Sequence, residues 1–84
     1  KKLLDRLLKT PKPRDFPWDD LVTLMAQAGF DVACDGGSHH MFEHRDTGFR
    51  FSMSKTHPRG VLKLYQVKDA IDALTAVGVI SEDM

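Results

Sequence analysis

An 84-residue chain with 42% hydrophobic and 29% charged residues has the composition of a single folded domain with a modest core, not of a disordered chain. Its 12 basic and 12 acidic residues cancel, which argues against a protein that coats nucleic acid by bulk charge. The single cysteine, Cys34, excludes an internal disulfide framework and fits the reducing cytoplasm. We expect no membrane span, which needs roughly 20 apolar residues, and no secretory signal.

The first segment, residues 1–14, is predicted to be an amphipathic helix followed by a proline-rich linker. Four leucines form one apolar stripe at helical spacing within Lys1–Lys9. The two prolines of Thr10–Arg14 then end the helix, because proline lacks the amide donor. This helix could pack on the domain, exchange with a second copy to form a homodimer, or be held loosely. Residues 15–84 are predicted to form the main domain.

A second helix is predicted over about Trp18–Ala28. Pro17 fits the first helical turn, and a pair of aspartates follows near the positive end of the helix dipole. Apolar residues recur at helical spacing, and Gly29 stands where a left-handed cap is needed. We expect Trp18 and Met25 to be core residues of this helix.

Alternating polarity predicts three strands, joined by turns at residues 35–38 and 45–48. The strands are Phe30 to Cys34, about His39 to His44, and Phe49 to about Ser54. Cys34 shares the apolar parity of its strand, so it is predicted to be a small buried hydrophobe and not a reactive thiol. In the third strand, Phe49 is expected on the same side as Phe51 and Met53.

The parity of the second strand separates its two adjacent histidines. His40 shares a face with Phe42 and His44, whereas His39 lies on the opposite face. If helices cover one face of the sheet, His40 leans towards them and His39 points outward, on the same side as Arg50. A slip of one residue in the strand register would exchange the two roles.

The last third of the chain predicts a polar loop and a final helix. The loop spans Lys55–Gly60, and helical spacing returns from Lys63 or Leu64, with Gly78 as the cap. The element order is helix, linker, helix, three-strand meander and helix. This order predicts an α+β fold in which helices cover one face of a three-stranded antiparallel sheet and leave the other face at least partly open.

Basic residues and histidines gather in one window of the sequence, from His39 to Lys68. The window contains all four histidines and two acidic residues, and its six basic residues are Arg45, Arg50, Lys55, Arg59, Lys63 and Lys68. A locally positive face of this kind can attract phosphate, although the same charges could be an ordinary solvated surface. Histidine titrates nearest neutrality, so an exposed histidine beside cations can act as a general acid or base.

The turn before the second strand offers a further anion-binding feature. Gly36 and Gly37 would let backbone amides approach a phosphate closely. Two other chemistries are not supported by the pattern. Cys34 with the histidines at 39, 40 and 44 matches no standard zinc arrangement, so no metal is predicted, and Ser38 lacks the nucleophile elbow of a hydrolase.

Four motifs follow one another around this turn: a helix ending in Ala28-Gly29-Phe30, then Gly37-Ser38-His39-His40-Met41-Phe42, a His57-Pro58 loop, and a last helix ending in Gly78-Val79-Ile80. Together they resemble the HicA family, the toxins of HicA/HicB toxin-antitoxin systems, over about Phe16–Ile80. Phe16–Leu21 and Leu62–Val67 are similar to a branch of that family with an N-terminal extension like Lys1–Arg14.

The resemblance implies a fold like that of double-stranded-RNA-binding domains and a ribosome-independent mRNA endoribonuclease. It also implies a cognate HicB-type antitoxin protein that covers the site. The family's catalytic histidine follows the glycine-serine pair, which maps to His39. We expect His39 to take the proton from a ribose 2′-hydroxyl without a metal or cofactor. His40 is the alternative catalyst, and His57 is a candidate helper or a loop-structuring residue.

The residues expected to hold the RNA are Gly37, Ser38, Arg50, Lys55, Arg59 and Lys63. Phosphate contacts of this kind make binding sensitive to salt. An alternative function of a different class is a non-catalytic RNA-binding or partner-binding module that uses the same basic face.

Overall fold

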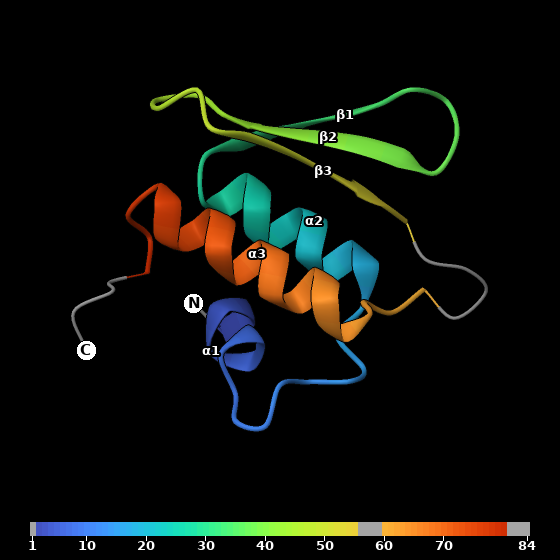
Figure 1. The fold of residues 1–84 in the computed structure, drawn as a ribbon, viewed down its shortest axis with the longest axis vertical. Helices are drawn as coiled ribbons and strands as arrows, with labels where there is room; N and C mark the ends of the chain where they lie inside the picture. Colours follow the sequence, from blue (N-terminus) through green and yellow to red (C-terminus); the bar gives the residue numbers. More distant parts are fainter. Residues whose placement is uncertain (1, 56–59, 81–84) are drawn as a thin grey trace.

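The fold is a three-stranded sheet covered on one face by helices, in a computed structural model that describes residues 2–55 and 60–80. The elements are α1 (Lys2–Leu7), α2 (Trp18–Gln27), β1 (Phe30–Cys34), β2 (His39–His44), β3 (Arg50–Ser54) and α3 (Leu64–Ala76). Figure 1 shows α2 and α3 side by side beneath the sheet, with α1 on their far side. Within the described ranges, no helix is long and apolar enough to cross a membrane.

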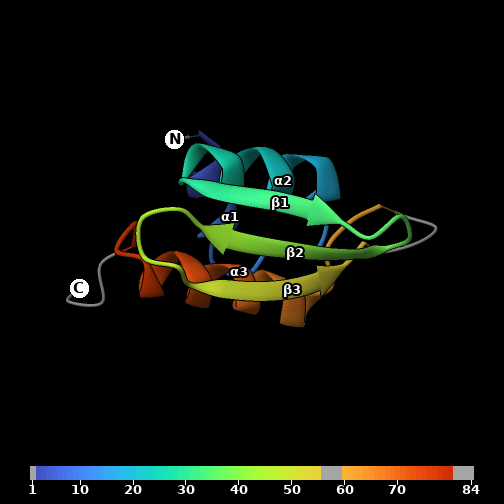
Figure 2. The same cartoon turned by 90° about the horizontal axis from the view of Figure 1, so that it is seen from above.

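The sheet is antiparallel, with β2 between β1 and β3 (Figure 2). His39 is the cross-strand partner of Ser54, and His40 lies between Cys34 and Met53. The predicted α+β architecture is confirmed, with the helix-strand-strand-strand-helix layout of double-stranded-RNA-binding domains preceded by a short helix. Strand parity is confirmed too, because Phe42 is buried while its neighbours Met41 and Glu43 are exposed.

One apolar core lies between the sheet and the helices. Its largest members are fully buried aromatic and aliphatic side chains from every layer: Phe16, Trp18, Leu21, Met25, Phe30, Phe42, Val67 and Leu74. The ring of Phe42 stacks on that of Phe51 with centroids 4.8 Å apart. Full burial of side chains this size stabilises the fold by about 1.5–3 kcal/mol each. Trp18 and Met25 are therefore core residues, as the helical spacing predicted.

Phe49 was predicted to begin the third strand on the same side as Phe51, and the structure corrects only where the strand begins, because the two rings line the same hollow with centroids 6.4 Å apart. β3 begins at Arg50, and Phe49 is 36% exposed. Its backbone N–H donates to the hydroxyl oxygen of Thr47 at 3.1 Å, whereas its C=O accepts from the N–H of His44 at 2.8 Å, so Phe49 joins the turn to the strand. Turn geometry thus shortens the strand by one residue without changing the side on which Phe49 lies.

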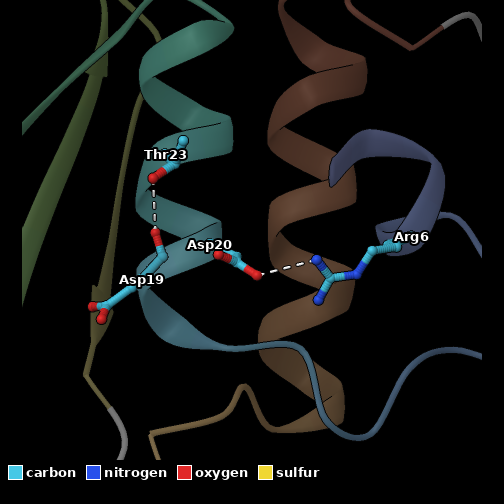
Figure 3. Close-up of polar contacts among 4 residues, drawn as sticks. All are labelled: Arg6, Asp19, Asp20 and Thr23. Atoms are coloured by element: carbon cyan, nitrogen blue, oxygen red, sulfur yellow. Dashed lines mark hydrogen bonds and ion pairs between the residues drawn. The ribbon is translucent and has the colours of Figure 1, made fainter. Parts of the chain in front are cut away.

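Of the three arrangements open to the leading helix, the structure has α1 packed on the domain. Leu7 is buried in the same core as α2 and α3. The guanidinium of Arg6 donates to the Asp20 carboxylate at 3.1 Å, as Figure 3 shows, and lies 5.0 Å from the centre of the Phe16 ring. The Thr23 hydroxyl donates to the Asp19 carbonyl on the neighbouring face of α2, away from Arg6 (Figure 3). Burial of Leu7 and the two contacts of Arg6 therefore hold α1 against the helical layer.

Gly29 connects α2 to β1 in a conformation that a side chain would disturb. Its φ is +98°, in the left-handed region that glycine adopts readily. A Cβ atom at this position would lie 3.1 Å from Nε2 of His44. Both ring nitrogens of His44 are hydrogen-bonded, so the ring has little freedom to move aside.

Replacing Gly29 with alanine is expected to lower the free energy of unfolding by more than the left-handed backbone alone costs, which is about 1–2 kcal/mol. Gly48→Ala is the matched control, because Gly48 also has a positive φ (+78°) but open space around its Cα. Urea unfolding of both variants separates the two effects. Equal losses at the two positions would show that the contact with His44 costs nothing.

Candidate functional site

His39 projects from the exposed face of β2, at the end of the sheet nearest the glycine turn. It is exposed, and its cross-strand partner is Ser54. In the described part of the chain, the imidazole of His39 has no hydrogen-bond partner. Both ring nitrogens are therefore open to solvent or to a ligand, as proton transfer with a bound substrate requires.

His40 points the other way and is held at the edge of the core. Its ring meets the Trp18 ring edge-on, with centroids 5.0 Å apart. Nδ1 lies 2.8 Å from the Ser38 carbonyl oxygen, and because that oxygen can only accept, Nδ1 carries the proton. The aromatic contact and the hydrogen bond fix the ring and join the turn to α2. His40 therefore lies on the core side, as parity predicted.

His44 is a structural histidine with both nitrogens engaged. It is 7% exposed. Nε2–H donates to the Ala28 carbonyl at 3.1 Å, which leaves Nδ1 to accept from the Thr47 backbone N–H at 3.3 Å and to pair with the Thr47 hydroxyl at 3.1 Å. The ring thus joins the end of β2 to the end of α2. Parity placed His44 on the core face, but the contact with Ala28 joins residues 16 positions apart in the sequence.

The glycine turn between β1 and β2 uses its own polar groups. The Gly37 N–H donates to the Asp35 carboxylate at 3.0 Å, so this amide is not directed at an outside anion, contrary to the expectation from sequence. The Cys34 thiol donates to the Gly37 carbonyl at 3.1 Å. Cys34 is exposed, which corrects the prediction of a buried hydrophobe. It is the last residue of an edge strand, where the sheet runs into the turn and core packing ends.

The expected basic face divides into two regions. At the end of the sheet away from His39, Arg45 pairs with Asp31 at 2.7 Å and Arg50 lies 4.0 Å from Glu43. Glu43 lies four residues beyond His39 on β2, which is about 13 Å at roughly 3.3 Å per residue. The charges of this region are thus balanced, and Arg50 is remote from the histidine.

The second basic region lies at the His39 end of the sheet. The backbone N–H of Lys55 donates to the Ser38 carbonyl at 2.8 Å, which places this half-buried lysine beside the start of β2. Lys63 is exposed just before α3. The remaining predicted residues, His57 and Arg59, lie outside the described residues.

Gln66 connects the start of α3 to this end of the sheet, and sequence reasoning missed it. The side chain is 1% exposed. Its amide nitrogen donates to the Ser54 carbonyl at 2.8 Å, and its amide oxygen accepts from the Lys63 N–H at 2.9 Å. Gln66 therefore ties Lys63 to the cross-strand partner of His39. A signal was present, since glutamine three residues after a helix cap is the second half of a capping box.

Replacing Gln66 with methionine, which has a similar shape, is expected to lower the free energy of unfolding by about 1–3 kcal/mol, because each of two hydrogen bonds contributes about 0.5–1.5 kcal/mol. The loss stays in this range because both hydrogen bonds are only partly buried, so a backbone group that loses its partner costs less than a fully buried one would. Gln27→Met on the exposed face of α2 is the control. Thermal unfolding measures both, and equal stabilities would contradict the bridging role.

Comparisons of the chain with protein-family models, with curated proteins and with solved structures found no match. Within residues 2–55 and 60–80, no group of three or more His, Cys, Asp or Glu side chains is arranged to hold a metal ion. The evidence for a function therefore lies in the placement of the side chains and in the motifs that resemble HicA.

Proposed function

We propose that the protein is an mRNA endoribonuclease, the toxin of a toxin-antitoxin pair, acting in the cytoplasm and using His39 for proton transfer. One observation carries the proposal. Among the described histidines, His39 alone is exposed on the open sheet face without a hydrogen-bond partner, whereas His40 and His44 are held by structural contacts. The resemblance of the surrounding motifs to HicA supports the same residue.

The proposed reaction begins with neutral His39 accepting the proton of a ribose 2′-hydroxyl. The 2′-oxygen attacks the adjacent phosphorus, and the bond from phosphorus to the 5′-oxygen breaks. The products are a 2′,3′-cyclic phosphate and a 5′-hydroxyl, whose proton comes from His57 or from water. General acid-base help of this kind contributes about 10²–10⁴-fold to the rate.

The RNA backbone is proposed to cross the His39 end of the sheet. Lys55 and Lys63 supply positive charge there, and Ser38 stands next to the histidine. Arg59 belongs to the same proposed site, whereas Arg50 would reach only a more distant part of the RNA chain. Binding through these cations weakens as the salt concentration rises. Binding releases counterions from the RNA, and this release becomes less favourable at high salt.

A HicB-type antitoxin is the proposed protein partner, and it would block the enzyme by covering His39 on the open face of the sheet. Co-expression with the neighbouring open reading frame tests this partnership. Cells are expected to tolerate the chain only when that reading frame is expressed as well. Equal growth with and without it would count against a toxin.

Incubation of the purified protein with RNA in excess chelator tests the enzymatic proposal. Cleavage that persists supports a reaction performed by histidine, whereas cleavage that disappears on removal of metal would contradict the mechanism. Residual nuclease contamination is controlled by His39→Ala protein purified in parallel.

A non-catalytic RNA-binding or partner-binding module is the second candidate. It is favoured by one observation: within residues 2–55 and 60–80, the two other histidines are occupied, so His39 has no second free imidazole beside it. Salt-sensitive binding of RNA without cleavage, by protein that also leaves cell growth unaffected, would establish this alternative.

A further inference from the structure

The strand β3 has a free edge whose backbone groups can be located. Among the described strands it pairs with β2 alone. The N–H of Lys55 donates to the Ser38 carbonyl, and the N–H of His44 donates to the Phe49 carbonyl, both at 2.8 Å. Hydrogen-bonded pairs alternate along an antiparallel ladder. Residues 49, 51, 53 and 55 therefore bond to β2, and the N–H and C=O of Ser52 point to the free edge.

A hollow of about 320 Å³ lies beside this edge, between β3 and α3. It is lined by Phe49, Phe51, Ser52, Asp69, Asp72 and Ala73. Figure 2 shows that α3 runs along β3 and extends past it on the side away from β2. One wall is thus apolar and belongs to the sheet, and the other wall carries two carboxylates on the helix.

The two carboxylates differ in what they already bind. Asp72 accepts a hydrogen bond from Lys68 at 2.9 Å, and this bond, the charge of Asp72 and, to a smaller extent, the charge of Asp69 raise the pKa of Lys68 above its usual value. Asp69 has no ion-pair partner in the described part of the chain. An unpaired carboxylate beside exposed aromatic surface favours a ligand that brings both a positive charge and apolar area.

We propose that this groove binds an extended segment of a partner protein, which adds as a fourth strand to β3. The free N–H and C=O of Ser52 would bond to the backbone of the segment, in the manner of β-strand addition. Side chains two residues apart on a strand point to the same side. The segment would therefore carry an apolar residue against Phe49 and Phe51 and, two residues away, a lysine or arginine against Asp69.

The chemistry of the groove selects this occupant over nucleic acid. The Asp69 carboxylate, unpaired among the described residues, repels phosphate. The edge offers the N–H and C=O of every second residue up to Ser52, which matches a peptide strand, whereas the C=O of Ser54 is already bonded to Gln66. The groove also lies away from His39, which is paired with Ser54 at the other end of β3. A segment bound here is independent of the proposed RNA cleavage.

A selection from a phage-displayed library of random nine-residue peptides against the whole purified chain tests the proposal. Enriched peptides are expected to share an apolar residue and a lysine or arginine two positions apart. A synthetic enriched peptide should bind at least tenfold more weakly to Asp69→Lys, and equally well to Asp19→Lys, a control on an exposed residue of α2. Enrichment of no peptide, or of peptides without a basic residue, would overturn the proposal.

The backbone contact is tested separately. Ser52→Pro removes only the N–H that points to the free edge, so it should weaken the peptide while the β2–β3 ladder stays intact. If thermal unfolding shows that this variant is not folded, the wild-type protein is tested instead with the same peptide methylated on its backbone nitrogens. The methylated peptide is expected to bind more weakly to the same extent. Unchanged binding of the methylated peptide contradicts strand addition. Strand addition is also contradicted if the chain forms concentration-dependent dimers that the peptide does not dissociate. His39→Ala should bind the peptide like the wild type, which separates this result from the fate of the nuclease proposal.

Discussion

Replacing His39 with alanine is expected to reduce RNA cleavage by about 10²–10⁴-fold, the usual contribution of a general acid or base. Growth inhibition on expression should disappear with it. Because His39 is exposed and has no hydrogen-bond partner among the described residues, the melting temperature should stay close to that of the wild type. Cleavage of a labelled RNA and thermal unfolding, measured on the same preparation, check both parts.

The neighbouring variant, His40→Ala, is the matched control for this experiment. It should lower stability, because it removes the contact with Trp18 and the hydrogen bond to the Ser38 carbonyl. Cleavage should persist at temperatures where the variant is folded. The reverse pattern, in which only His40→Ala abolishes cleavage at full stability, would show that the wrong histidine has been assigned.

Replacing Trp18 with alanine is expected to lower the free energy of unfolding by about 3–5 kcal/mol, the usual cost of removing a buried tryptophan. The side chain is 2% exposed and meets the rings of His40 and Phe42 edge-on, at 5.0 and 6.2 Å between centroids. Domains of this size have total stabilities of about 5–15 kcal/mol, so the variant should be close to unfolding. Urea unfolding followed by circular dichroism measures the loss.

Trp18→Phe is the control, because it keeps an aromatic ring at the same place and should cost clearly less than the alanine variant. The backbone N–H of Trp18, which donates to the Gly60 carbonyl at 2.8 Å, is unchanged in both. A loss below about 1 kcal/mol for Trp18→Ala, within the range of surface substitutions, would mean that this residue does not anchor the core.

The fold could be predicted from sequence because its signals are local. Apolar spacing located α2 and α3, and the left-handed glycines at 29 and 78 marked their ends, with φ of +98° and +85°. Period-two alternation set the face of each strand, and so separated His39 from His40. That separation requires β2 to begin without a bulge. The pairing of His39 with Ser54 shows that it does.

The chemistry of the site was less predictable because it depends on contacts between distant segments. Charge counting could not show that Arg45 pairs with Asp31 and Arg50 lies beside Glu43. Parity suggested a buried Cys34, but parity does not show where a strand extends beyond the helices that cover the sheet. The bridging role of Gln66 was missed for the same reason: its bond to Lys63 is local, but its bond to Ser54 forms only when α3 docks on β3.

The chemical ends of the RNA fragments test the role of His39 most directly. Attack by a ribose 2′-oxygen must leave a 2′,3′-cyclic phosphate on one fragment and a 5′-hydroxyl on the other, so mass spectrometry of a short RNA cut by the wild-type protein is the measurement. We predict these two ends, and about 10²–10⁴-fold less of them from His39→Ala in the same time. Fragments with a 3′-hydroxyl and a 5′-phosphate, or equal amounts of the cyclic phosphate from both proteins in the same time, would contradict proton transfer by His39.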